Sequence, residues 1–128
     1  MVDIDRRGIT RVDFTIGNNV WWDDQLQLGD PSDFSWTLNG ANFYLNIQNT
    51  DSDPTPLLAL TSTAGQIQVI DPINRILGMN VPDATIRNAL PEGDYVYDCI
   101  MQTISNGQVD GLFYGKLHVE QGITIPPT

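Results

Sequence analysis

Residues that commonly carry chemistry are few in this chain. Histidine and cysteine occur once each, at His118 and Cys99. A catalytic triad or a structural zinc site needs several such side chains in one chain, so we expect neither. Alternation along the strands places Cys99 on a core-facing side and His118 on an outer side. We therefore expect no catalytic residue, no resident metal and no cofactor.

Two acidic segments offer oxygen atoms to a ligand. The segment 51–53 (DSD) has oxygens that suit Ca²⁺, but it lacks EF-hand spacing, and local Asx turns explain the same residues. Asp23 and Asp24 follow Trp21 and Trp22, a composition that also occurs in sugar-binding sites. Neighbouring strand residues point to opposite faces, so the two carboxylates are not expected to act as a glycosidase pair.

The tryptophan pair is expected to divide between the core and the surface. An outward tryptophan more often marks a protein contact than an active site. We therefore take Trp21, Trp22 and Asp23 as candidate interface residues, together with Ile123 and Ile125 of the C-terminal tail. The first ten residues are expected to contribute contacts as well.

The composition excludes several classes of partner. The net charge is −10, which argues against direct binding to nucleic acid and against attraction to anionic membranes. No apolar stretch approaches the ~18 residues of a membrane span. The N-terminus lacks an apolar signal core, and a single cysteine cannot form an internal disulfide.

Apolar and polar residues alternate along most of the chain, and turn residues interrupt this pattern at short intervals. Such a pattern predicts an all-β sandwich. We expect seven or eight antiparallel strands, within the segments 10–17, 19–29, 40–49, 56–62, 65–71, 74–81, 94–105 and 111–121. One short helical turn is predicted over 82–90, after Pro82 and Asp83. Residues 1–128 form one domain with extended terminal arms.

The predicted core follows from the same alternation. The residues expected to point inward are Phe14, Phe43, Leu45, Ile47, Ile67, Val69, Tyr95, Tyr97, Leu117 and Val119. Asn106-Gly107 is the strongest hairpin signal in the chain.

The stretch LPEGDYVYDC (90–99) predicts a tyrosine corner. In immunoglobulin-like sandwiches, a tyrosine near the start of one strand bonds through its hydroxyl to backbone a few residues upstream. Here Gly93 would permit the sharp turn and Tyr95 would supply the hydroxyl. The residue two positions later is Tyr97 rather than a disulfide cysteine, so apolar packing would take the place of the disulfide. The expected architecture is therefore Ig-like.

Four segments in this order resemble a known family: 30–48, 56–71, 86–101 and 106–124. Their motifs are TLNG (37–40), Gly-x-Ile-x-Val (65–69), the Leu-to-Tyr-Asp run 90–98 and the glycine-punctuated final strand 107–119. Together they resemble small β-sandwich virion proteins of tailed bacteriophages, related in pattern to the N-terminal domain of baseplate upper proteins.

The resemblance implies a non-catalytic structural role in a virion, in the tail, neck or baseplate. It implies other virion proteins as partners, a homo-oligomer or multi-copy ring, and production in the cytoplasm of a bacterial host. Capsid decoration is one alternative. A carbohydrate-binding or adhesion module that uses Trp21 or Trp22 with Asp23 is another. The segment 19–29 fits the family least well, so we expect this protein's own specificity there.

Overall fold

Strands dominate the computed structural model, which describes residues 10–50, 52–53 and 55–126. The elements are β1 (Thr10–Arg11), β2 (Phe14–Gly17), β3 (Gln25–Gln27), β4 (Ala41–Gln48), β5 (Leu58–Thr61), β6 (Ile67–Asp71), β7 (Ile76–Met79), α1 (Asp83–Ala89), β8 (Gly93–Thr103) and β9 (Val109–Glu120). The short helix lies where the sequence predicts it, and the Asn106-Gly107 turn joins β8 to β9 as expected. No helix in the described part of the chain is long and apolar enough to cross a membrane.

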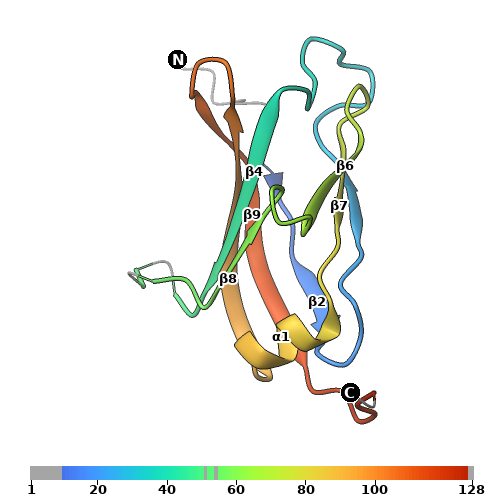
Figure 1. Ribbon diagram of the computed structural model, residues 1–128, viewed down its shortest axis with the longest axis vertical. Coiled ribbons are helices and arrows are strands. Elements are labelled where there is room, and N and C mark those ends of the chain that lie inside the picture. The colour runs from blue at the N-terminus through green and yellow to red at the C-terminus, as the bar shows by residue number, and fades with distance from the viewer. Residues whose placement is uncertain (1–9, 51, 54, 127–128) are drawn as a thin grey trace.

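Two sheets face each other and confirm the predicted all-β sandwich (Figure 1). The larger sheet has the order β1-β9-β8-β4-β5, and β2 also pairs with β9. The smaller sheet has the order β3-β7-β6. The larger sheet is mixed rather than wholly antiparallel, because β1 and β2 run parallel to β9. No tight turn links these strands to β9, so nothing local imposes an antiparallel direction.

The core fills the space between the sheets. Nine of the ten residues predicted to point inward are buried, and the exception is Val69, which is 39% exposed. Val69 lies on the edge strand β6, just before an irregular step in its pairing with β7 between Val69 and Asp71. An irregular edge ladder bends the strand and redirects its side chains, which strict alternation does not foresee.

A register shift in the β8–β9 pair adds one residue to the core. Cys99 lies opposite Phe113, whereas the next residue, Ile100, lies opposite Gly111. The intervening Leu112 is thus the extra residue of a bulge, and both Leu112 and Phe113 are buried. Alternation alone would have placed one of them outside.

The predicted corner is confirmed. The Tyr95 hydroxyl donates to the carbonyl oxygen of Pro91 at 2.5 Å, four residues upstream. Gly93 begins β8 with a φ of 158°, a conformation that residues with side chains rarely adopt. The corner turns the chain from α1 into β8, a core strand of 11 residues.

Candidate functional site: two apolar ends and an outer-face hollow

The tryptophan pair divides as predicted, and the buried member is Trp22. Its side chain is 2% exposed, and its ring meets Phe14 edge-on at 5.2 Å between centroids. Its indole nitrogen donates to the Asp24 carboxylate at 3.0 Å. Trp22 therefore belongs to the core, and its expected place in an interface has to be corrected. Trp21 is 53% exposed, and Asp23 is also exposed.

The C-terminal tail lies beside the segment that carries Trp21. The Asn18 side-chain oxygen accepts from the Gly122 amide at 2.9 Å, and the Asn19 side-chain amide donates to the Thr124 carbonyl at 2.8 Å. Gly122 allows this close approach, because a Cβ there would lie 1.9 Å from the Asn19 side chain. Figure 1 shows the end of β9 and the described part of the tail at the same end of the sandwich as α1.

This arrangement brings together exposed apolar residues that are a hundred positions apart in the chain. Val20 and Trp21 lie on one segment, and Ile123 and Ile125 lie on the other. Ile123 is 99% exposed. We call these four residues the tail-end patch. The first ten residues are also expected to contribute to an interface, but residues 1–9 lie outside the described residues.

A second group of exposed apolar residues lies on the loops before β4, between β6 and β7 and between β8 and β9, and Figure 1 shows these loops at the opposite end of the sandwich. Phe34, Ile73 and Ile104 are 49–66% exposed, and we call them the loop-end patch. Backbone hydrogen bonds join the three loops that carry them: Leu38 donates to Pro72 at 3.0 Å, and Ile104 donates to Gly40 at 2.9 Å. The two patches therefore occupy opposite ends and differ in composition.

A buried arginine holds the loop that carries Phe34. The Arg75 guanidinium donates to the backbone carbonyls of Leu28, Asp30, Trp36 and Ile73 at 2.7–3.2 Å. It also lies 5.1 Å from the centroid of the Trp36 ring. The sequence does not signal this role, because an isolated arginine normally predicts an exposed position.

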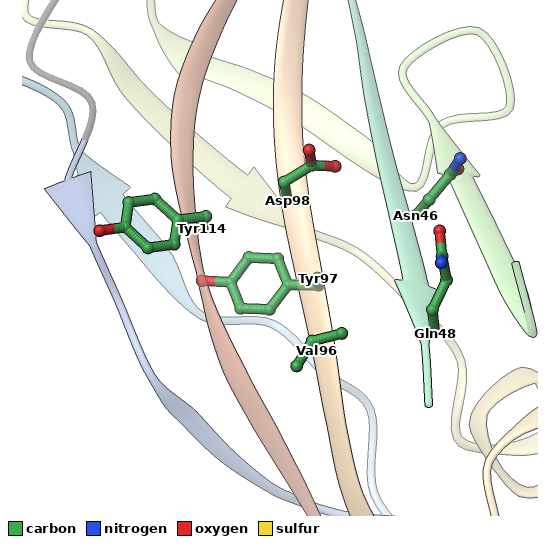
Figure 2. A pocket seen from close by; sticks show the side chains of 6 residues that line it. All are labelled: Asn46, Gln48, Val96, Tyr97, Asp98 and Tyr114. Atoms are coloured by element: carbon green, nitrogen blue, oxygen red, sulfur yellow. The ribbon is translucent and has the colours of Figure 1, made fainter. Parts of the chain in front are cut away.

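A shallow hollow of about 360 Å³ lies on the outer face of the larger sheet. Asn46 of β4, Asp98 of β8 and Tyr114 of β9 form one row across three neighbouring strands, because they are direct cross-strand partners. Figure 2 shows these side chains with Val96 and Gln48 below them. The sequence places each of them on an outward position, but the register that aligns them appears only in the sheet.

The Tyr97 hydroxyl and the Cys99 thiol lie on the core side of the sheet near this hollow, and neither is placed to react. The Tyr97 ring borders the hollow, but its hydroxyl donates to the Val12 carbonyl on the core side, and burial raises its pKa. Cys99 is buried as expected, and burial together with the Asp98 carboxylate raises the pKa of its thiol. A thiol in this setting stays protonated and is a poor nucleophile.

The remaining candidate groups form no reactive constellation. The His118 Nδ1 atom lies 2.6 Å from the Asp94 carboxylate, and this pair lies on the outer face of the larger sheet, as expected for a surface histidine. Asp53 caps a local turn by accepting from the Thr50 amide at 3.0 Å. Within the described ranges, no group of three or more His, Cys, Asp or Glu side chains is placed to hold a metal ion.

Comparisons with known proteins leave the family open. No family model matches the chain, and no curated protein matches it either. Among solved structures, the chain is similar to the crystal structure of CopC from Methylosinus trichosporium OB3b, at 14% identity and with 96% of each chain covered. The TM-score is 0.38, so we take neither a family nor a function from this similarity.

Proposed function

We propose that this chain is a non-catalytic structural component of a tailed bacteriophage virion, and that copies associate through their ends. The observation that carries the proposal is the tail-end patch. The sequence predicts Trp21, Ile123 and Ile125 as contact residues, and all three side chains are exposed. Exposed apolar patches on a small domain usually mark an interaction surface. The resemblance of residues 30–124 to phage sandwich proteins supports the assignment to a virion.

The second copy of the chain is the partner that the two ends fit best. The tail-end and loop-end patches differ, so a contact between them is heterologous. The tail-end patch of one copy contacts the loop-end patch of the next copy. Heterologous contacts close into a ring or continue as a filament. The net charge of −10 opposes unspecific aggregation and leaves association to the apolar ends. A multi-copy ring in the tail, neck or baseplate follows, with capsid decoration as the alternative location.

The test of the virion assignment uses infection. The full chain is produced with a tag during phage growth, and tailed particles are separated from free protein on a density gradient. We expect the wild-type chain to band with the particles. A variant with Trp21→Ser and Ile123→Ser should band at least about tenfold less, since each loses the burial of a large apolar side chain.

Val69→Ser serves as the matched control, because Val69 is an exposed apolar residue away from both ends. It should band like the wild-type chain. Absence of the wild-type chain from particles would contradict the virion assignment. Equal banding of the wild type and the tail-end variant would instead contradict the role of the tail-end patch.

A further inference from the structure

The outer face of the larger sheet is exposed and carries unsatisfied polar side chains at its centre. Figure 1 shows the smaller sheet on one side of the larger sheet and no described helix or strand on the other. The Asn46 amide, the Asp98 carboxylate and the Tyr114 hydroxyl form no hydrogen bond with any described residue. Three different hydrogen-bonding groups therefore line one hollow and remain available to a ligand.

Several other polar groups on this face already form hydrogen bonds within the chain. The Gln48 side chain donates to the carbonyls of Thr50 and Asp53, and the Gln102 side chain donates to the Gly107 carbonyl. His118 and Asp94 pair with each other. The Tyr44 hydroxyl on the same face also bonds to no described residue, but Tyr44 does not line the hollow, where Asn46, Asp98 and Tyr114 lie together.

The dimensions of the row indicate the size of a ligand. Neighbouring strands in a sheet lie about 4.8 Å apart, so the row from Asn46 through Asp98 to Tyr114 spans about 10 Å. That is about the length of two linked sugar rings. The hollow of about 360 Å³ is shallow and open, which suits a chain of rings lying across the strands.

The chemistry of the row indicates the class of ligand. The Tyr114 side chain is 46% exposed and presents an apolar ring on which the C–H face of a sugar can stack. Asp98 accepts hydrogen bonds from hydroxyl groups, and the Asn46 amide both donates and accepts. A central carboxylate on a chain of net charge −10 repels anionic ligands. One carboxylate and one amide are too few oxygen ligands for a resident cation.

We propose that the hollow formed by Asn46, Asp98 and Tyr114 binds a neutral oligosaccharide of about two sugar units. This places a sugar site on the outer face of the larger sheet and not at the Trp21–Asp23 segment. The smaller hollow beside Trp21 holds about 200 Å³, and Asp24 on its wall is already bonded to the Trp22 indole. Sugar binding at the outer face leaves both ends of the sandwich free for assembly.

The experiment is an NMR titration of the isotope-labelled full chain with neutral oligosaccharides at millimolar concentration. The probes are di- and trisaccharides of glucose, mannose, xylose, galactose and N-acetylglucosamine. We expect amide shifts for at least one probe in the central parts of β4, β8 and β9. Asp98→Ala and Tyr114→Ala should each weaken that binding about tenfold or more. Tyr114→Phe should retain most of it, because the ring face remains.

Asp94→Ala is the matched control, since Asp94 lies on the same strand and face as Asp98 but outside the hollow. It should bind like the wild type. No shift with any of the probes overturns the proposal, and shifts centred on Trp21 assign the sugar to the other segment and also overturn it. A change in oligomeric mass on Asp98→Ala or Tyr114→Ala without a change in sugar binding makes the face a protein contact and equally overturns it. The exposed positions of the substitutions leave folding intact, which thermal melting verifies.

Discussion

At the scale of single residues, Arg75 is the least expected feature of the molecule. It is completely buried and has a positive φ of 58°. A buried cation is costly unless its donors are satisfied, and here four backbone carbonyls accept from it. The arginine thus links the loop after β3 to the start of β7 and positions Phe34 at the loop end.

Replacing Arg75 by methionine should lower the free energy of unfolding by about 3 kcal/mol or more. The aliphatic stem is retained, but several carbonyls lose charge-assisted hydrogen bonds in a partly buried setting. Urea denaturation measures the change. Arg11→Met is the control, because Arg11 is exposed and should change stability by about 0.5 kcal/mol or less. Equal midpoints for the two variants would contradict the assigned role.

The tyrosine corner makes a smaller and separate contribution. Tyr95→Phe removes the hydroxyl that donates to Pro91 and should cost about 1 kcal/mol, the net contribution of one hydrogen bond. Tyr44→Phe is the control, since the Tyr44 hydroxyl bonds to no described residue. Thermal or chemical denaturation of both variants tests the prediction, which fails if Tyr95→Phe is as stable as the control.

At the scale of elements, the attachment of the first strands to β9 depends on a few specific contacts. β2 pairs in parallel with β9 from Phe14↔Leu117 to Gly17↔Glu120. Between β1 and β2, the Asp13 carboxylate accepts from the Lys116 amide at 2.9 Å. Gly115 allows this approach, because a Cβ there would lie 2.1 Å from the Val12 carbonyl oxygen.

Gly115→Ala should therefore loosen the first strands. The added methyl group meets backbone atoms that cannot turn away, so we expect a loss of about 1–3 kcal/mol, as in other overpacked sites. Hydrogen exchange of the β2 amides should accelerate more than exchange of the β4 amides. Gly78→Ala is the control, because the nearest atoms that its methyl group would meet belong to the Ile70 and Gln25 side chains, which can move. Unchanged exchange in β2 would show that the approach at Gly115 is not tight.

The Asp13 anchor should also make stability depend on pH. The backbone hydrogen bond from Lys116, and next the hydrogen bond from Arg11, lower the pKa of Asp13 below its ordinary value of 3.8. A lowered pKa in the folded state means that the stabilisation is fully present above the unfolded pKa and is lost as pH falls through the folded pKa. The difference in stability between wild type and Asp13→Asn should therefore shrink below about pH 4.

Urea denaturation between pH 2 and pH 7 measures that difference. Arg11→Met should keep the larger part of the pH dependence, because the Lys116 amide is the main cause of the shift. If the difference in unfolding free energy between wild type and Asp13→Asn stays constant from pH 2 to pH 7, the ionised Asp13 carboxylate does not stabilise the fold as proposed.

At the scale of the whole molecule, two dissimilar apolar ends have a distinctive consequence for assembly. The tail-end patch and the loop-end patch lie at opposite ends of the sandwich (Figure 1). Sheet edges remain at β5 and β6 and offer further pairing surfaces. If the ends join head to tail, a copy that has lost one patch can still join an intact neighbour through its other patch.

Mixing two single-end variants tests this directly. One variant carries Trp21→Ser and Ile123→Ser, and the other carries Phe34→Ser and Ile104→Ser. We expect each variant alone to be monomeric, because one of the two contacting surfaces is missing from every copy. The equimolar mixture should give dimers and nothing larger, since one intact end meets another and both outer ends are blocked.

Light scattering coupled to size-exclusion chromatography measures the masses. The wild-type chain should form larger species under the same conditions. A mixture that stays monomeric, or single variants that still assemble, would contradict head-to-tail association. The latter outcome would favour pairing through the sheet edges instead.

Local patterns in the sequence were sufficient to predict most of the elements. Alternation predicted the strands and nine buried core positions, and Asn106-Gly107 predicted the β8–β9 turn. The run 90–99 predicted the Tyr95 corner, whose hydrogen bond spans four residues. These features depend on backbone geometry and burial over a few neighbouring residues, so local residue types and their spacing are enough to predict them.

Only the tertiary structure decided the features that join distant segments. The parallel pairing of β2 with β9, the contact of Asn19 with Thr124 and the row from Asn46 to Tyr114 all depend on strand register. The burial of Arg75 depends on carbonyls that two separate loops supply, the loop between β3 and β4 and the turn between β6 and β7. Register and loop approach are set by the packing of the whole core, so no local pattern encodes them.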